Sequence, residues 1–377
     1  MTKKKIYFIG FLLLITFIVT SYNVIQFFNE RASFQYSDWL INYQAGFVRR
    51  GFVGEIFFQL SNILQFRLDI LILVFVLILY MTFYLNFYKI IRKINIKLID
   101  LFVILSPISF FYTAFEQKAS GRKEIIFLSL FSLFILIIKK ISPLNQIFLI
   151  ILITTITSLT HSGLIFYNVY FFALFTCYNL KLGIKKISLY LLPLIFSSLI
   201  TLIFISNNST ISSGELEIIC KSIIEYLPNC GKGDYVTTLT WGLKNNFEGN
   251  KSLWLNTNYI IFYFVAFILC FGVFLYISNN SKLHNFNFLF IIILCMVSTL
   301  PLYLIGADYG RYMYVSYLSS ILIYYFLLSE NIIKRKINFY NIKKIIIIPI
   351  LVVYSFTFTI PLCCKTKLKF NYIKLID

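Results

Sequence analysis

Paired arginines bounded by glycines form the first group of residues in this sequence whose types and spacing could do chemistry. They lie in the segment SDWLINYQAGFVRRGFVGEIFFQL, where Arg49 and Arg50 are adjacent and Asp38 comes shortly before them. Guanidinium groups bind phosphate oxygens through paired N–H donors, and glycines let the backbone approach such a ligand closely. The segment therefore predicts a phosphate site. The alternative is a loop held by internal pairs between its acids and arginines.

A second cationic group follows in EQKASGRKE, where Arg122 and Lys123 precede Glu124. We expect this group at the start of an apolar helix, because a long apolar run follows it. Backbone N–H groups and the helix dipole favour an anion at such a helix start. A basic pair there predicts a second set of phosphate contacts. The alternative is that both side chains only reach the lipid headgroups.

His161 is the third candidate, in a turn with Ser162 and Gly163 between two apolar runs. A histidine can exchange protons near neutral pH or donate to a phosphate oxygen, although many such residues only cap a helix. Motifs such as HExxH or CxxC do not occur in the sequence. We therefore predict no metal and no cofactor.

The fourth candidate segment is GADYGRYMY, where Asp308 and Arg311 stand among glycines and tyrosines. Aromatic faces stack on sugar rings, and charged groups hydrogen-bond sugar hydroxyls. Asp308 and Arg311 are three residues apart and would pair if they lie on a helix. Tyrosines at a membrane interface are also common for no functional reason.

The elements that must position these residues are membrane-spanning helices. The 377 residues are 59% hydrophobic and 13% charged, and the mean hydropathy is +0.82, which a water-soluble surface would not tolerate. We therefore predict an all-α polytopic bundle, with residues 1–377 as one integral membrane domain in a lipid bilayer. About eleven apolar runs approach the length that crosses a bilayer: 6–26, 69–88, 98–115, 125–138, 146–160, 164–179, 187–206, 258–277, 288–305, 314–329 and 345–362.

The distribution of charge predicts the orientation of these runs. Every second loop is rich in Lys and Arg, which places the N-terminus in the cytoplasm, whereas the other loops hold nearly all the acids. All four candidate segments then lie on the outer side. The lysines after residue 362 conflict with this pattern, so ten or twelve crossings remain open. The net charge of +19 is spread over short loops, which argues against nucleic-acid binding.

Two of the outer segments are long, and only the second is large enough for a small cap outside the bilayer. Residues 27–68 form the first, with an amphipathic stretch from Val53 to Phe66 that predicts an interfacial helix. Residues 207–257 form the second and contain Cys220 and Cys230, which we expect to form a disulfide in an oxidising compartment.

The architecture and the segments DWLINYQAGFVRRG, SGRKE, THSG and DYGR resemble those of membrane proteins encoded in polysaccharide loci. The whole chain resembles the bacterial O-antigen polymerases, often called Wzy. A weaker resemblance is to glycosyltransferases of the GT-C type, which use polyprenyl-phosphate sugars and carry an acidic residue in the first outer loop, as Asp38 would be. The two families imply closely related chemistry. A third hypothesis is a flippase or transporter of lipid-linked units.

The polymerase resemblance implies a multi-pass protein of the bacterial inner membrane with its site facing the periplasm. Its substrates would be polyprenyl-pyrophosphate-linked oligosaccharides, and a chain-length regulator protein is a possible partner. Arginines would bind the pyrophosphate leaving group, and a base would accept the proton of the acceptor hydroxyl. The expected roles are Asp38 or His161 as base, Arg49, Arg50 and Arg122 at the pyrophosphate, and Asp308 and Arg311 at the sugars. Lys123 is expected to bind substrate beside Arg122.

Overall fold

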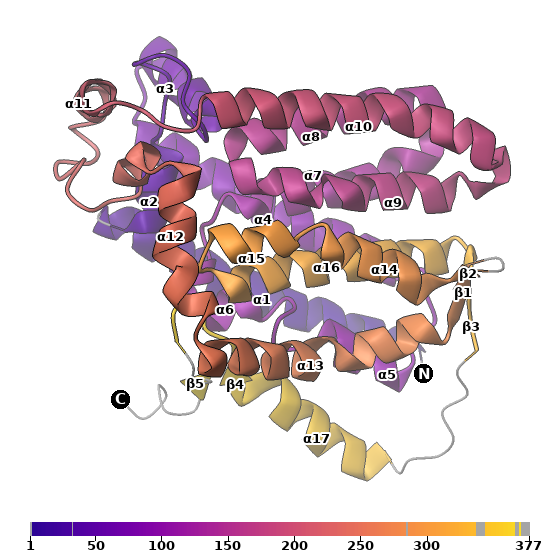
Figure 1. The fold of residues 1–377 in the computed structure, drawn as a ribbon. Helices are drawn as coiled ribbons and strands as arrows, with labels where there is room; N and C mark the ends of the chain where they lie inside the picture. The colour runs from indigo at the N-terminus through magenta and orange to yellow at the C-terminus, as the bar shows by residue number, and fades with distance from the viewer. Residues whose placement is uncertain (1, 32, 284–285, 337–343, 366–368, 371–377) are drawn as a thin grey trace.

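Long helices lie side by side and run in alternating directions in the computed structural model (Figure 1), which describes residues 2–31, 33–283, 286–336, 344–365 and 369–370. In these ranges, seven helical segments are apolar and at least 18 residues long. Since 20 helical residues cover about 30 Å, their length and composition suit a bilayer. The seven are α1 (Thr2–Glu30), α4 (Leu68–Ile91), α8 (Pro143–Thr160), α10 (Ile184–Asn207), α13 (Thr257–Asn279), α14 (Phe288–Val297) with α15 (Leu300–Ile305), and α16 (Tyr309–Ser329).

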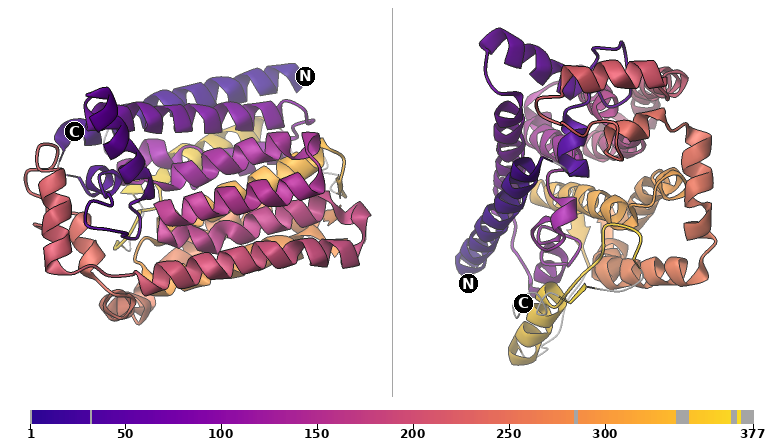
Figure 2. Two further views of the ribbon diagram at one scale, coloured as in Figure 1. Left: turned by 90° about the horizontal axis from the view of Figure 1, so that it is seen from above. Right: turned by 90° about the vertical axis from the view of Figure 1, so that its left-hand side faces the viewer.

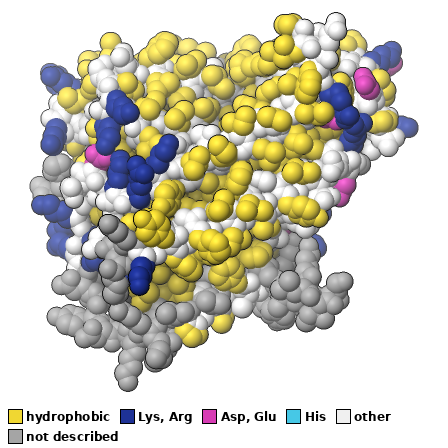
Figure 3. Space-filling view, turned by 180° about the vertical axis from the view of Figure 1, so that it is seen from behind, with side chains coloured by type: hydrophobic (Ala, Val, Ile, Leu, Met, Phe, Trp, Pro, Cys, Tyr) yellow, Lys and Arg dark blue, Asp and Glu magenta, His cyan; other side chains and the backbone are white. Residues whose placement is uncertain are grey.

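The chain is therefore a mostly helical, membrane-embedded protein, as the composition predicts. Figure 3 shows a broad band of hydrophobic side chains across one face of the bundle, with charged side chains gathered toward two opposite edges. Exposed side chains such as Phe196 and Ile203 on α10, or Phe264 on α13, contribute to the apolar surface. Such a surface is stable only where lipid replaces water.

The other four apolar runs form shorter or interrupted helices. Run 125–138 forms α7 (Glu124–Ile137), which is only about 21 Å long. Run 98–115 is broken between α5 (Leu98–Ile104) and α6 (Tyr112–Phe115), in a stretch that contains Pro107. The last two are η3 (Ser162–Tyr167) with α9 (Asn168–Tyr178), and α17 (Lys344–Phe356). Eleven crossings consequently remain a prediction.

Helix α16 lies at the centre of the bundle. Almost all of its side chains are buried, and it packs against α4, α7, α9 and α13. Tyr317 donates from its hydroxyl to the carbonyl oxygen of Val103 at 2.8 Å, across the broken segment. The first residues of α16, which include Arg311, are thus held in a fixed position at one end of the bundle.

The two ends of the bundle carry different connections (Figures 1 and 2). The end where α1 begins, called here the basic end, holds η2 (Ile138–Lys140), η4 (Leu180–Leu182) and a small sheet of strands β1 (Ser281–Leu283), β2 (Phe286–Asn287) and β3 (Ile333–Arg335) in the order β2-β1-β3. The opposite end, called the cap end, holds α2 (Phe34–Trp39), α3 (Phe52–Leu64), η1 (Gln117–Ala119), α11 (Ser213–Ser222), η5 (Val236–Thr240) and α12 (Leu243–Trp254).

Both long loops of the cap end contain helices. The amphipathic stretch predicted at 53–66 forms α3, which exposes Ile63 and Leu64, and loop 207–257 folds into α11, η5 and α12. The structure joins Cys220 to Cys230 by a disulfide, with Cα atoms 5.4 Å apart.

The chain after α17 returns to the cap end. A short strand pair, β4 (Phe358–Thr359) with β5 (Lys369–Phe370), follows the helix. The amide of Gly310 donates to the carbonyl oxygen of Leu362 at 3.1 Å, and the hydroxyl of Tyr263 donates to that of Pro361 at 3.1 Å. Residues 361 and 362 therefore lie beside the start of α16. Several of the lysines that conflict with the charge pattern lie outside the described residues.

Candidate functional site

Lys123 connects the first two candidate segments in the interior of the cap end. Its ammonium group is fully buried and lies 3.4 Å from Oδ1 of Asp38, which α2 places at the same depth. The same ammonium group donates to the carbonyl oxygen of Arg50 at 2.7 Å. Because a buried charge requires partners, Lys123 fixes the loop that carries Arg50 against the start of α7.

Arg50 adopts a backbone conformation that is unusual for a residue with a side chain. Its φ is +71°, in the left-handed region, which costs about 1–2 kcal/mol for residues other than glycine. Its guanidinium group donates through Nη1 to the hydroxyl of Tyr235 and lies 4.9 Å from the centre of that ring. The turn therefore directs Arg50 toward η5, in the second long loop.

Arg49 is held by the same loop through different atoms. Its Nη2 donates to the carbonyl oxygens of Thr238 at 2.7 Å and Trp241 at 2.8 Å. The two arginines thus anchor the 207–257 loop on the first loop, with Arg49 bound to its backbone and Arg50 bound to Tyr235. Within the described residues neither arginine forms an ion pair with Asp38, which pairs with Lys123 instead. The alternative of a loop closed by internal pairs of this kind is therefore not observed for Asp38.

Glu124 connects the third and fourth candidate segments. As the first residue of α7, it places Oε1 3.3 Å from Nε of Arg311 and 3.8 Å from Nε2 of His161. Arg311 also binds Oδ2 of Asp308 through Nη2 at 2.9 Å, as their spacing on a helix predicts. Arg311 is therefore flanked by two carboxylates, and His161 lies at the edge of this group.

Arg122 lies at the margin of the cluster. Its Nε donates to the carbonyl oxygen of Lys118 at 3.2 Å, and its guanidinium carbon is 6.0 Å from the centre of the Tyr235 ring. It borders a small gap beside Glu124 and Arg311. The prediction that Arg122 and Lys123 stand at the start of a helix is correct, and the side chain of Lys123 is buried inside the protein.

A cavity of about 340 Å³ opens between these segments. Its polar wall contains five of the predicted site residues, namely Arg49, Arg50, His161, Asp308 and Arg311. Apolar side chains also line it, with Leu202 and Ile205 from α10 and Leu302 and Ile305 from α15. Asp38, Arg122 and Lys123 do not line the cavity. Lys123 contacts the backbone of Arg50, which does line it, and Asp38 pairs with Lys123.

Positive charge exceeds negative charge around the cavity. The cluster of predicted residues with Glu124 contains five cations, Arg49, Arg50, Arg122, Lys123 and Arg311, and three carboxylates, Asp38, Glu124 and Asp308. The net charge of this set is +2 when His161 is neutral. Both ring nitrogens of His161 and Nη1 of Arg311 are buried and have no hydrogen-bond partner among the described residues. Buried polar groups are normally bonded, so the unbonded guanidinium N–H of Arg311 favours an anionic ligand, whereas a neutral His161 offers one donor and one acceptor nitrogen.

The local field also sets the protonation of His161. Burial, followed by repulsion from Arg50 and Arg311, holds the pKa of His161 well below its ordinary value. Burial lowers the pKa of Lys123 in the same way, although the carboxylate of Asp38 opposes the shift. Burial and the neighbouring Arg50 lower the pKa of Arg49 to about 10. At neutral pH the cavity therefore offers charged arginines and a neutral imidazole.

Three residues of this site were not among the predicted site residues. Glu124 was named only as a neighbour of Lys123, Tyr312 only as one of the tyrosines that could stack on a sugar, and Tyr235 was not predicted. Tyr235 lies in a loop whose sequence has no motif, so only the fold reveals its contact with Arg50. Tyr312 lines the cavity, and its ring centre is 5.6 Å from the guanidinium carbon of Arg311.

Within the described residues, no group of three His, Cys, Asp or Glu side chains is placed to hold a metal ion.

Known proteins add no constraint to this picture. Comparison with protein-family models, with curated proteins and with solved structures gave no match.

Proposed function

We propose that this protein is a membrane glycosyltransferase that joins polyprenyl-pyrophosphate-linked oligosaccharide units, as an O-antigen polymerase does. The observation that carries the proposal is the cavity at the cap end, where an excess of buried positive charge meets an apolar wall. A lipid-linked sugar has the matching parts, a diphosphate between a sugar and an isoprenoid chain. The basic residues of the opposite end favour a cytoplasmic position for that end, and on this proposal the cavity faces the periplasm from a bacterial inner membrane.

The proposed reaction forms one glycosidic bond and breaks one glycosyl-phosphate bond. An acceptor hydroxyl oxygen attacks the anomeric carbon of the donor chain, the bond from that carbon to the phosphate oxygen breaks, and the polyprenyl pyrophosphate leaves with the bonding electrons. Arg50 and Arg311 stabilise the negative charge that develops on the leaving phosphate. Because these side chains are already fixed by Tyr235, Glu124 and Asp308, little reorganisation is needed when the charge appears.

The acceptor proton passes to a group on the cavity wall. His161 and Asp308 both line the cavity, whereas Asp38 is bound to Lys123 behind it. This supports His161 or Asp308 as the base in the proposed reaction, with Asp38 positioning Lys123 and, through it, Arg50. A neutral His161 can accept a proton, and the departing phosphate would stabilise the resulting imidazolium.

One observation supports the second candidate, a GT-C transferase that adds a single sugar from a polyprenyl monophosphate. Helix α1 is followed by the acidic Asp38 on α2 and then by the amphipathic α3, before α4 returns along the bundle. This order matches the resemblance noted for the first outer loop. A flippase has less support, since its substrate contacts should lie near the middle of the bundle, whereas the cationic side chains here lie at helix ends.

Deletion of the gene and gel analysis of the lipopolysaccharide separates these candidates. Loss of the ladder, with a single repeat unit retained on the lipid core, supports the polymerase. Loss of every unit points to a flippase or to an earlier transferase and contradicts the polymerase.

A variant experiment then tests the cavity itself. Arg311→Gln should abolish the ladder even when the amount of folded protein is matched to that of the wild type, whereas Arg92→Gln, an exposed cation of the basic end, should leave it intact. A normal ladder with Arg311→Gln would remove the cavity from the reaction.

A further inference from the structure

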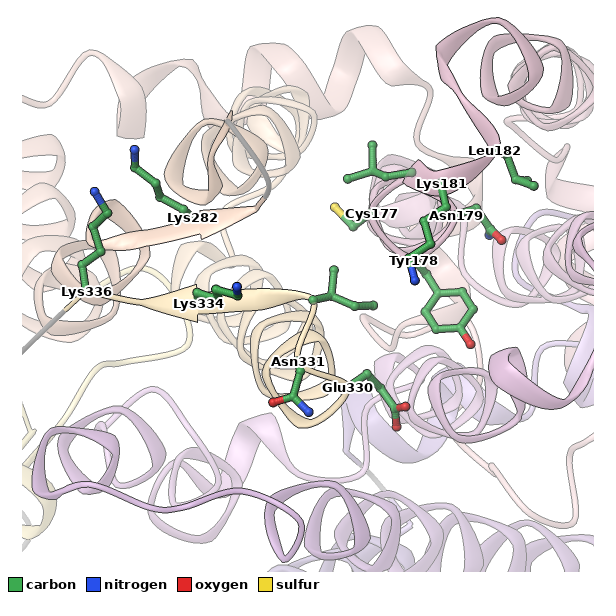
Figure 4. A pocket seen from close by; sticks show the side chains of 12 residues that line it. Cys177, Tyr178, Asn179, Lys181, Leu182, Lys282, Glu330, Asn331, Lys334 and Lys336 are labelled. Carbon is green, nitrogen blue, oxygen red and sulfur yellow. The ribbon is translucent and has the colours of Figure 1, made fainter.

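A second and larger cavity lies at the basic end of the bundle, the end opposite to the cap-end site. Its volume is about 780 Å³, and its walls come from the end of α9, η4, the end of α16, and strands β1 and β3 (Figure 4). Four lysines line it, Lys181, Lys282, Lys334 and Lys336, together with Glu330. The volume falls within the range of ordinary small-molecule sites.

The lysines around this cavity are placed unfavourably with respect to one another. Lys282 on β1 and Lys334 on β3 are direct cross-strand partners, an arrangement that destabilises a sheet when the charges are alike. The side chain of Lys336 contacts that of Lys282, and this contact and its repulsion hold the pKa of Lys336 below the ordinary value. Figure 4 shows these two side chains extending in the same direction from neighbouring strands.

The acid at this cavity does not neutralise its lysines. Oε1 of Glu330 lies 2.9 Å from the ammonium group of Lys139, which is not part of the cavity wall. In the ranges that the structure describes, Lys181, Lys282, Lys334 and Lys336 make no ion pair with any carboxylate. Orientation in a membrane explains why lysines occur at this end, but it does not require them to share one hollow and to face each other across two strands.

The cavity also has a defined depth relative to the bilayer. Its wall residues directly follow the apolar segments α9 and α16, and Lys282 follows α13. Residues at the ends of membrane-embedded helices stand at the level of lipid headgroups. The phosphate group of a lipid can reach this level while its acyl chains stay in the hydrocarbon region.

We propose that the basic-end cavity binds the phosphate group of an anionic phospholipid, with Lys282, Lys334 and Lys336 as its main contacts. The negative charge relieves the repulsion between these lysines and stabilises the β1–β3 pairing. This site is independent of the proposed glycosyl transfer. Free phosphate offers the same chemistry, so the experiment includes it as a separate ligand.

Native mass spectrometry of the purified full-length protein in detergent tests the proposal. The probes are phosphatidylglycerol, the zwitterionic phosphatidylcholine and inorganic phosphate. The cavity variant replaces Lys282, Lys334 and Lys336 by Gln. The matched control replaces Lys140, Lys185 and Lys186 by Gln, which removes the same charge from exposed positions at the same end.

Phosphatidylglycerol should bind the wild type and the control equally, and should bind the cavity variant about a hundredfold more weakly, since each of the three lysines near an anionic lipid contributes roughly fivefold. Equal loss in both variants would show attraction to the general surface charge and would overturn the site. Lysine-dependent binding of inorganic phosphate without phosphatidylglycerol would overturn the lipid assignment. A thermal unfolding curve of each variant establishes that it is folded, and Lys334→Gln alone replaces the triple variant if that one does not fold.

Discussion

Nε of Arg311, in the first turn of α16, lies 3.3 Å from Oε1 of Glu124, the first residue of α7. The contact joins the central helix of the bundle to a helix whose N-terminus also favours a negative charge. Glu124 lies 3.8 Å from His161 as well, so one carboxylate contacts two of the side chains that form the cavity wall. We regard this pair as the main electrostatic support of the site.

Glu124→Gln should therefore destabilise the protein strongly. The substitution leaves Arg311 buried with only Asp308 as an ionic partner, and removing one member of a buried pair typically costs about 3–5 kcal/mol. The measurement is thermal unfolding in detergent. Glu217→Gln is the control, because that exposed acid pairs with Lys221 only on the surface of α11, where such a pair contributes about 0.5 kcal/mol or less. Equal shifts in the two variants would contradict a supporting role for Glu124.

Most of the fold could be predicted from the sequence because lipid imposes a simple rule. A continuous apolar run must form a helix that satisfies its own backbone, so runs such as 187–206 or 258–277 were recognisable from their length. The break in run 98–115 was not predicted. Where the helix is interrupted, its free backbone carbonyl groups accept hydrogen bonds from residues far away in the sequence, and the sequence alone does not show these partners. Tyr317 of α16 supplies one of them.

The composition of the site was predictable in part. Arginines and acids at helix ends stood out because orientation did not explain them, and the structure brings Arg49, Arg50, His161, Asp308 and Arg311 to one cavity. Their partners were not predictable in the same way. Spacing can pair Asp308 with Arg311 on one helix, but contacts between Lys123 and Asp38 depend on tertiary packing. The expectation that Asp38 or His161 is the base came from the family resemblances and did not include the contact of Asp38 with Lys123.

Two replacements of Tyr235 should reduce activity to different extents, because the hydroxyl and the ring each contact Arg50. Tyr235→Phe removes the hydroxyl that accepts from Arg50 but keeps the ring over the guanidinium group, which lies 4.9 Å from its centre. Loss of one hydrogen bond to a charged group corresponds to about tenfold in rate. Tyr235→Leu removes both contacts and should cost more. The measurement is elongation of lipid-linked units by purified protein.

Tyr22 provides the control for this series, because its side chain is largely exposed on α1. Tyr22→Leu should leave elongation unchanged. If Tyr235→Leu is as active as Tyr235→Phe, the ring does not position Arg50.

The disulfide should hold the 207–257 loop over the cavity. Cys220 and Cys230 close a short loop next to η5, where Thr238 and Trp241 accept hydrogen bonds from Arg49. Such a loop closure contributes roughly 2–3 kcal/mol. The double variant Cys220→Ser with Cys230→Ser should be cleaved faster by trypsin at the loop lysines, and mass spectrometry of the fragments measures the rate. Cys364→Ser, at an exposed cysteine outside the loop, is the control and should show the wild-type rate.

Close packing of α3 should make Gly54 intolerant of a side chain. A Cβ atom at Gly54 would collide with the carbonyl oxygen of Ile41, which is part of the backbone and cannot rotate away. Gly54→Ala should therefore lower the unfolding temperature and displace the turn at Arg50. Gly272→Ala on α13 introduces the same atom into open space and should have little effect. A stable Gly54→Ala protein would show that α3 can move away from the first loop.

The stability of the protein should depend on pH through His161. Its pKa in the folded protein is well below 6.5, because of burial and of repulsion from Arg50, Arg311, Lys123 and Arg122, which Glu124 does not offset. The unfolded chain binds a proton near pH 6.5, whereas the folded chain does so only at lower pH, so the unfolded state binds more protons between the two values. The stability is thus complete above about pH 6.5 and decreases as the pH falls below it.

Thermal unfolding of the wild type and of His161→Gln from neutral to mildly acidic pH measures this effect. The wild type should lose stability more steeply below about pH 6.5, and the difference isolates His161 because the carboxylates titrate in both proteins. Inorganic pyrophosphate bound beside the imidazole would offset the arginines, raise the pKa of His161 and reduce the slope in the wild type only. Identical slopes in the two proteins without pyrophosphate would show that His161 does not experience the positive field of the cavity, and the basis for a phosphate site there would be lost.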